Sequence, residues 1–169
     1  MLSIETRDGL SQPEKETLFG WSDDPWDNNR YGLTWTGTDV RFLGLEDGKP
    51  VTHSGLYFHS IDMGGREMTL AGLNSVITVP HARGKGYGGQ IVGAAEDYMS
   101  EERPVDFGML FCHPELQAFY GPRGWRAIDG PVTIDQPEGK RQTPHVVMVF
   151  PIADDTWPEG PVILNSYPW

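Results

Sequence analysis

The sequence contains few cysteines and few cations, and each shortage excludes a class of protein. Among its 169 residues Cys112 is the single cysteine, so no internal disulfide can form and a reduced, buried thiol is expected. Lysine and arginine number 13 against 24 aspartate and glutamate residues, which gives a formal net charge of −11. This charge argues against nucleic acid as a partner, because a phosphate backbone needs a basic surface.

Long apolar runs and secretory signals are also missing. No segment has the length of a membrane span, and residues 1–5 lack a basic-then-apolar pattern, so we expect a cytoplasmic protein with no membrane partner. The spacing of the five histidines shows no metal signature, and no metal is predicted. At 38% hydrophobic and 22% charged residues, the composition is typical of one globular domain over residues 1–169. The negative charge favours a cationic small molecule as ligand.

The hydrophobic pattern predicts a mixed α/β (α+β) chain in which most strands form antiparallel hairpins. One predicted helix, over about residues 88–102, joins a strand ending at Val79 to a strand starting at Val105, so these two strands should lie parallel. The expected strands cover residues 3–7, 33–45, 51–61, 68–79, 105–112, 125–134 and 145–152, with further helices at about 12–20 and 114–120 and a tail at 153–169.

A glycine-rich turn lies between the β-branched strand and the predicted helix. Residues 83–89 read Arg-Gly-Lys-Gly-Tyr-Gly-Gly, a composition that leaves free backbone N–H groups at the positive end of a helix dipole. The turn therefore predicts a binding site for a phosphate group. The glycine spacing also fits the dinucleotide fingerprint, but hairpins precede the turn, and no Gly-Lys-Ser/Thr closes it, so a dinucleotide fold and a P-loop are both disfavoured.

Two segments together resemble the GNAT acetyltransferase superfamily. Arg83-x-x-Gly86-x-Gly88 resembles its acetyl-coenzyme A pyrophosphate loop, and Leu116 to Trp125 resembles its second signature, a helix ending in tyrosine followed by Arg-Gly-aromatic. The resemblance covers about residues 73–128 in the expected order. It implies the GNAT fold, with a mixed, mainly antiparallel central sheet, a splayed parallel strand pair and flanking helices, and it implies acetyl-coenzyme A as co-substrate.

The resemblance also implies roles for individual residues. Tyr120 matches the superfamily tyrosine that protonates the departing thiolate, and the pantetheine arm is expected in the splay between the parallel strands, near the N–H groups of residues 76–78. No covalent intermediate is needed, so Cys112 is not expected to act as a nucleophile. The expected coenzyme contacts are Val79, Arg83, Gly84, Lys85, Gly86, Tyr87, Gly88 and Gly89.

A closer similarity, to the aminoglycoside 2'-N-acetyltransferases, lies in the second half of the chain. It is carried by residues 120–125, 130–132, 137–144 and 149–152 and by Trp169 at the end of the sequence. This similarity implies a cationic amino sugar as acceptor, with a kasugamycin-type molecule as one candidate, and a role in antibiotic resistance. It also implies that the tail brings the α-carboxylate of Trp169 to the acceptor, where it can bind the amine or act as a base.

The acceptor site departs from the family at Asn74. The family places there a glutamate that acts as a base through water, and an amide cannot take a proton at neutral pH. Asn74 and Ser75 can still orient a water. The remaining candidate bases are the Trp169 carboxylate, a histidine such as His113, and the carboxylates of an acidic loop whose Asp23, Asp24, Trp26 and Asp27 are also expected to contact the acceptor.

Two other functions remain open on the same residues. A GNAT enzyme can act on another small amine or on a peptide, and a GNAT-like domain without the glutamate can serve as a non-catalytic acyl-coenzyme A sensor. Dimers are common in the superfamily, so a homodimer is a further expectation.

Overall fold

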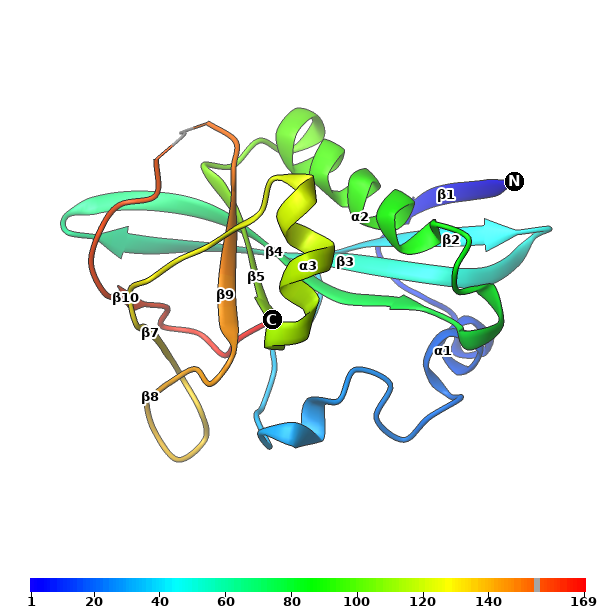
Figure 1. Ribbon diagram of the computed structural model, residues 1–169, viewed down its shortest axis with the longest axis horizontal. Helices are drawn as coiled ribbons and strands as arrows, with labels where there is room; N and C mark the ends of the chain where they lie inside the picture. The colour runs from blue at the N-terminus through cyan, green and yellow to red at the C-terminus, as the bar shows by residue number, and fades with distance from the viewer. Residues whose placement is uncertain (154–155) are drawn as a thin grey trace.

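A seven-stranded sheet forms the centre of the computed structural model, which describes residues 1–153 and 156–169 (Figure 1). Its strand order is β1-β2-β3-β4-β5-β9-β6, and each neighbouring pair is antiparallel except β4 with β5. The predicted GNAT architecture, a mainly antiparallel sheet with one parallel pair, is thereby confirmed. The strands are β1 Leu2–Arg7, β2 Val40–Glu46, β3 Lys49–Met63, β4 Arg66–Thr78, β5 Phe107–Cys112, β6 Arg126–Ala127 and β9 Val146–Pro151.

Short helices and a second, small sheet complete the fold. The small sheet has the order β10-β7-β8, with β7 Val132–Ile134, β8 Arg141–Gln142 and β10 Val162–Ile163. The α-helices are α1 Gln12–Phe19, α2 Tyr87–Asp97 and α3 Gln117–Tyr120. A wider helical turn, Tyr98–Glu102, extends α2, and 3₁₀ turns cover Asn28–Arg30, Pro80–Ala82, Pro114–Leu116 and Gly121–Arg123.

Local sequence chemistry accounts for the first helix and the hairpins. Helix α1 begins with a capping box, in which the Ser11 side chain accepts from the Glu14 N–H while the Glu14 carboxylate accepts from the Ser11 N–H. The β2–β3 turn places Asp47 and Gly48 at φ 49° and 73°, and the β3–β4 turn places two glycines at positive φ. Such turns match the twist of antiparallel strands, which explains why the hairpins were predictable.

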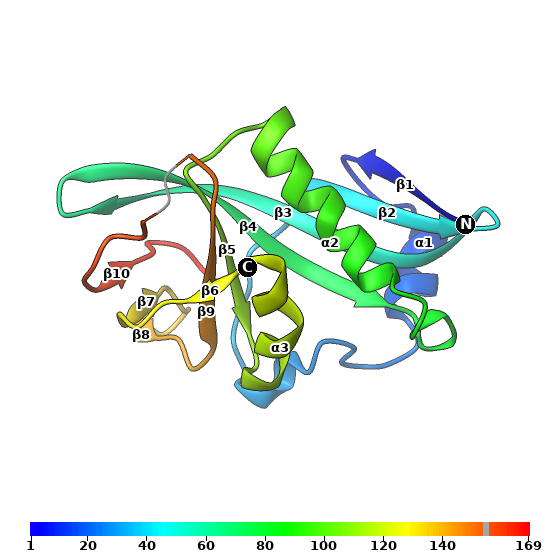
Figure 2. The ribbon, with the colours of Figure 1, turned by 45° about the horizontal axis from the view of Figure 1, so that its top comes forward.

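Each face of the large sheet has its own hydrophobic core. Helix α2 lies across the strands on one face (Figure 2), where Ile91, Val92 and Ala95 join a core with Phe42 and Leu56. The small sheet and the end of the tail cover the opposite face, where Val132, Ile134, Val162, Leu164 and Trp169 pack with residues of β4 and β5 such as Leu70 and Met109. The tail is therefore part of the core.

Strands β4 and β5 are paired over only three positions. The pairs are Leu70 with Phe107, Ala71 with Gly108, and Gly72 with Met109, and beyond them β4 continues to Thr78 without pairing to β5. Strand β5 is instead paired with β9 along its whole length, from Phe107 to Cys112. The two parallel strands therefore diverge after the third pair.

Trp169 lies at the point where these strands separate. Its indole N–H donates to the Met109 carbonyl at 3.0 Å, and a Cβ added to Gly72 would lie 2.3 Å from the ring. The absence of a side chain at Gly72 is what allows the indole to pack against the strand. Tyr57, His59 and Phe111 surround the ring at centroid distances of 5.7, 6.0 and 5.4 Å.

The structure corrects the predicted strand over residues 33–45, which begins only at Val40. The Thr34 N–H donates to the Gln136 side chain, which also donates to the Thr34 carbonyl, and the Thr36 N–H donates to the Pro168 carbonyl. These backbone groups pair with segments distant in sequence, so the stretch forms no ladder. The predicted strand region 125–134 is likewise divided, because β6 and β7 belong to different sheets.

Replacing Gly72 with Ala should destabilise the fold, since the new Cβ cannot coexist with the Trp169 indole in its present place. We expect a loss of about 1–3 kcal/mol in the free energy of unfolding, as for overpacked cores. Urea unfolding followed by tryptophan fluorescence measures this loss. Gly9→Ala is the matched control, because a Cβ at Gly9 meets no atom within 4 Å. Equal midpoints for the two variants would contradict the packing of Trp169 on Gly72.

Candidate functional site

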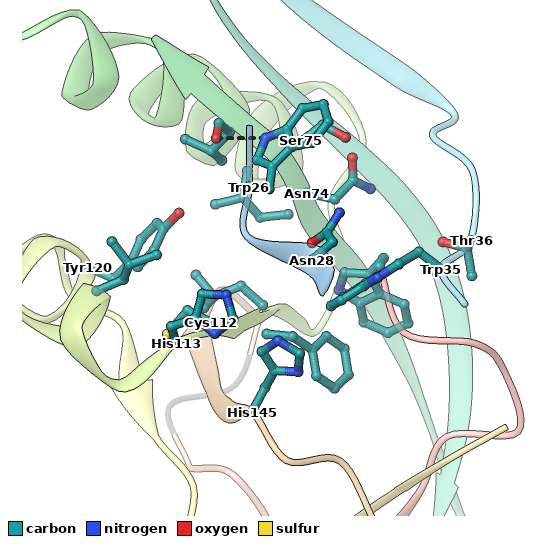
Figure 3. Close-up of a pocket in the computed structure, with 16 residues that line it drawn as sticks. Trp26, Asn28, Trp35, Thr36, Asn74, Ser75, Cys112, His113, Tyr120 and His145 are labelled. Atoms are coloured by element: carbon teal, nitrogen blue, oxygen red, sulfur yellow. Dashed lines mark hydrogen bonds between the residues drawn. The ribbon is translucent and has the colours of Figure 1, made fainter. Parts of the chain in front are cut away.

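The divergence of β4 and β5 opens a cavity of about 160 Å³ (Figure 3). One wall is formed by residues 73–76 of β4 and another by residues 110–113 at the end of β5. Tyr120 of α3, His145 before β9, parts of the loop at 26–36 and Trp169 close the remaining sides. The cavity therefore brings together segments from the whole length of the chain.

Tyr120 presents a phenol to this cavity. Its side chain is buried, and its hydroxyl has no hydrogen-bond partner in the described part of the chain (Figure 3). Burial raises the pKa of Tyr120 well above its ordinary value, so the phenol stays protonated at neutral pH. A protonated hydroxyl that faces a cavity is available as a hydrogen-bond donor or an acid.

A β-bulge shapes the β4 wall. Gly55 pairs with Asn74 and His53 with Ile77, so Ser75 and Val76 face β3 without regular ladder partners, and Ser75 adopts a positive φ of 50°. Two side chains hold the bulge: His53 Nδ1 lies 2.8 Å from the Ser75 carbonyl, and the Trp26 indole N–H donates to the Val76 carbonyl at 3.1 Å. The bulge therefore turns backbone of β4 toward the cavity, as bulges beside functional sites do.

Asn74 and Ser75 line the cavity, and their predicted contact with an acceptor stays a prediction. The Asn74 side-chain oxygen accepts a hydrogen bond from the Thr38 hydroxyl at 2.9 Å, so the amide is fixed in place. Trp26 also lines the cavity, whereas Asp23, Asp24 and Asp27 are not among its lining residues. The Asp24 carboxylate caps the turn that follows it, accepting from the N–H groups of residues 28 and 29, and Asp27 pairs with Arg30.

The glycine-rich turn stays open to a ligand. In the described part of the chain, the backbone N–H groups of residues 84–89 donate to no other group. Gly84 and Gly86 adopt positive φ values of 80° and 77°, and a Cβ at either would meet no atom within 4 Å. Gly86 is the N-cap of the 11-residue helix α2, so free N–H groups and the helix dipole act together there. This arrangement fits a phosphate or diphosphate.

The cations near this turn already have partners. Lys85 Nζ lies 2.9 Å from both oxygens of Glu46, and Arg83 donates to the Thr78 carbonyl and stacks over Trp21 at 5.1 Å. Val79 and Tyr87, two other predicted contacts, are buried in the core that includes Leu18 and Val51, and the Tyr87 hydroxyl donates to Glu46. Their predicted coenzyme contacts stay predictions.

Arg123 is a basic residue beside the helix that the sequence analysis did not single out. A Cβ placed on Gly89 would lie 3.3 Å from the Arg123 guanidinium, and a Cβ placed on Gly93 would lie 3.2 Å from it. The guanidinium therefore packs directly against these two glycines of α2. The Glu96 carboxylate holds it there at 2.7 Å and also accepts from the Trp125 indole N–H at 2.9 Å. The Arg-Gly-aromatic signature contained this residue, but only the fold shows which helix it contacts.

Two buried histidines meet at the far wall. His113 and His145 are 7% and 9% exposed, and their ring centroids lie 5.1 Å apart. The Trp35 ring contacts His145 at 5.2 Å. From the sequence, His113 and His145 are two of five candidate histidines, with His113 preferred, but they are not linked to each other or to Trp35, because no local pattern connects three positions so far apart. Figure 3 shows the two imidazoles across the cavity from Asn74.

Cys112 lies beside this site as a buried thiol. Burial raises its pKa to about 11, so the sulfur is protonated at neutral pH and is a poor nucleophile. Trp169 lines the cavity with its buried indole, and the predicted role of its carboxylate stays a prediction.

Two searches for other features gave negative results for residues 1–153 and 156–169. No group of three or more histidine, cysteine, aspartate or glutamate side chains there could hold a metal ion. No helix in those ranges has the length and apolar character needed to cross a membrane.

Comparison with known families identifies one match. The family model described as "Acetyltransferase (GNAT) domain" matches residues 15–128, which include the glycine-rich turn and Tyr120. No curated protein matches the sequence significantly.

Solved structures share the fold at low identity. A GNAT family N-acetyltransferase (YhbS) from Escherichia coli, solved in complex with CoA, matches with a TM-score of 0.64 and 16% identity, covering 98% of this chain and 89% of that one. An acyl-CoA N-acyltransferase from Pseudomonas aeruginosa matches with a TM-score of 0.59 and 20% identity, covering 89% and 99%. The ribosomal-protein-S18-alanine N-acetyltransferase of E. coli matches at 0.55 and 15%, covering 92% and 97%.

The two most strongly shifted histidines predict a loss of stability in mild acid. Burial lowers the pKa of His53 and of His145 to about 4, from an ordinary value of 6.5. As the pH falls, these two histidines therefore take up protons in the unfolded chain before they do so in the folded protein. Their contribution to the free energy of unfolding is complete above about pH 7 and is lost as the pH falls from 6.5 toward 4. At pH 5 each histidine should cost about 1–2 kcal/mol of the free energy of unfolding.

Urea unfolding at pH 7 and pH 5 measures this effect. In His145→Gln the difference between the two pH values should shrink by about 1–2 kcal/mol relative to the unmodified protein. His81→Gln, which replaces an exposed imidazole, should leave the difference unchanged. A His145→Gln protein with the full acid sensitivity would refute the assignment.

Proposed function

The chain belongs to the GNAT acetyltransferase family, and from this premise we propose that it transfers an acetyl group from acetyl-coenzyme A to a primary amine of a small, amino-sugar-like acceptor. One observation carries the proposal. The open glycine-rich turn lies close to the Tyr120 segment, since a Cβ placed on Gly88 at the start of α2 would lie 3.7 Å from the ring of Phe119, the residue before Tyr120. Tyr120 in turn lines the cavity between β4 and β5.

The residues at the turn fit a coenzyme A diphosphate. Free N–H groups of residues 84–89 can donate to its oxygens, and Arg123 lies beside the same helix. The gap between β4 and β5 offers the slot for an extended arm, with unpaired strand backbone at its edge. Bound acetyl-coenzyme A supplies the activated thioester that an amine can attack.

Tyr120 is the proposed acid. Among the described residues its hydroxyl has no hydrogen-bond partner, and it faces the cavity at the end of the strand gap. Burial keeps the phenol protonated at neutral pH, so it can donate its proton to the departing sulfur as the carbon–sulfur bond breaks. Cys112 is not used as a nucleophile, because its thiol is protonated and buried. The amine therefore attacks directly in this proposal.

Size and chemistry of the cavity support a small acceptor. A space of about 160 Å³ is comparable with cavities that hold a single six-membered ring, of about 150 Å³. No aspartate, glutamate, lysine or arginine side chain lines it, and its polar groups are those of asparagine, serine, threonine, histidine, tryptophan, tyrosine and cysteine. Such groups can form hydrogen bonds with the hydroxyls of one sugar ring. Further rings of a larger acceptor would have to lie outside the cavity, where the net charge of −11 favours a cationic molecule.

The function is tested by following thiol release from acetyl-coenzyme A with a panel of amines. Glucosamine and kasugamycin represent amino sugars, kanamycin represents a larger multi-ring aminoglycoside, and spermidine and a short peptide represent other acceptors. We expect the fastest release with a small amino sugar. Release with spermidine or the peptide but with no amino sugar would retain the acetyltransferase and refute the acceptor class, and release with no amine would favour a coenzyme sensor.

Replacing Tyr120 with Phe should lower kcat by about a hundredfold, since it removes the proton donor and keeps the ring. The affinity for coenzyme A, measured by titration calorimetry, should stay unchanged because the glycine-rich turn is intact. Tyr98→Phe is the control, as Tyr98 packs against Phe42 outside the cavity. An unchanged kcat in Tyr120→Phe would remove this residue from the mechanism.

A further inference from the structure

Three buried ring nitrogens in the acceptor cavity have no partner. They are Nδ1 of His113, Nδ1 of His145 and Nε1 of Trp35, and in the described part of the chain they are the only side-chain nitrogens or oxygens that are themselves inaccessible to solvent and make no hydrogen bond. All three residues line the same cavity. Buried polar atoms nearly always have a hydrogen-bond partner in folded proteins, so three unpaired atoms at one place indicate a ligand that forms hydrogen bonds with them.

The three rings form a continuous wall. Trp35 contacts His145 at a centroid distance of 5.2 Å, and His145 contacts His113 at 5.1 Å, with Tyr31 packed against both imidazoles at 4.8 and 5.6 Å. The wall is therefore rigid, and its unpaired nitrogens keep fixed positions. Tyr31 and the ion pair of Arg30 with Glu115 fasten the loop to the end of β5.

The donor and acceptor properties of the wall define its ligand. An indole N–H can only donate, so Trp35 requires an oxygen acceptor such as a hydroxyl, whereas a neutral imidazole nitrogen can accept a proton from an amine. A molecule with an amine beside a hydroxyl satisfies both requirements. The wall thus fits a vicinal amino alcohol better than a simple alkylamine.

We propose that His113 is the base that takes the proton of the acceptor ammonium, and that His145 and Trp35 bind the hydroxyl next to the amine. The proposal rests on the acetyl transfer proposed above. His113 directly follows β5, and the last residues of β5 form one side of the strand gap where the thioester would lie. His113 is therefore placed next to the position of the reacting carbonyl, whereas His145 lies before β9. It supplies the base that Asn74 cannot.

His145 suits the supporting role. Burial, together with the proximity of His113 and the charge of Arg30, lowers its pKa to about 4, so it is a neutral hydrogen-bonding group and a weak base at pH 7. The titratable groups around His113 are Tyr31, Cys112, Glu115, Tyr120 and His145. Of these, Glu115 is ionised, because the hydrogen bond from Arg30 lowers the pKa of its carboxyl group to about 2.

The proton balance of the step is complete. The ammonium gives one proton to His113, and the free amine forms a bond to the acetyl carbon while the carbon–sulfur bond breaks. The departing thiolate takes the proton of Tyr120, and the second proton lost by the nitrogen restores that phenol through solvent. His113 then releases its proton to water, so each turnover yields one amide, one thiol and one proton.

The deciding experiment is the pH dependence of kcat/KM for glucosamine, with acetyl-coenzyme A saturating. In His113→Gln, kcat/KM at pH 7 should fall by about a hundredfold, and the loss should diminish as the pH rises and the free amine becomes abundant. His81→Gln, with an exposed imidazole outside the cavity, should follow the unmodified protein. Trp35→Phe should reduce the preference for 2-aminocyclohexanol over cyclohexylamine.

A second measurement is independent of turnover. Nitrogen-15 NMR of the histidine rings, recorded while glucosamine is added to the protein with coenzyme A, should show shifts at His113 and His145 but not at His81. An unchanged kcat/KM for His113→Gln, or an equal loss at every pH, would overturn the base assignment. If no amine is acetylated by the unmodified protein, the proposed function fails, and the NMR titration still decides whether the wall binds an amino alcohol: an absence of shifts would overturn that part.

Discussion

The separation of β4 from β5 is the constraint on which the rest of the structure depends. The two strands are parallel neighbours over three residue pairs only, and beyond these pairs each strand hydrogen-bonds to a different partner. Strand β5 pairs with β9 along its whole length, while β4 stays paired with β3 and contains the bulge at Ser75. Backbone groups that would otherwise complete a sheet are left at the edge of a gap, and the cavity there is lined by Tyr120, Asn74 and His113.

Several long side chains keep the gap open. The Trp169 indole lies at its apex on Gly72, the Trp26 indole and the His53 ring hold the carbonyls of the bulge, and the Arg123–Glu96–Trp125 cluster ties α3 to α2. These interactions come from both termini and from the middle of the chain. The His53 and Trp26 interactions hold the carbonyls of Ser75 and Val76 at the bulge, where Ser75 has a positive φ, and the three residues with unpaired ring nitrogens line the cavity beside it.

The molecule as a whole is strongly acidic, but the cavity and the glycine-rich turn do not share this charge. The chain carries a net charge of −11, yet no aspartate, glutamate, lysine or arginine lines the cavity, and Lys85 and Arg123 near the glycine turn are paired with Glu46 and Glu96. In the proposed reaction, recognition of the diphosphate depends chiefly on backbone N–H groups of residues 84–89, and deprotonation of the amine depends on His113.

The sequence by itself determined the elements whose physics is local. The capping box of α1, the Asp47-Gly48 turn, the glycine-rich turn before α2 and the crossover that makes β4 and β5 parallel were all predictable, because turn chemistry and hydrophobic periodicity act over a few residues. Tyr120 and the family were predictable because their signatures are contiguous. Only the tertiary structure decided that Thr34 pairs with Gln136 and Thr36 with Pro168 of the tail, that Arg123 lies on α2, and that Trp35, His113 and His145 share one wall. Contacts of this kind depend on how distant segments pack around the strand gap, and no local pattern encodes that packing.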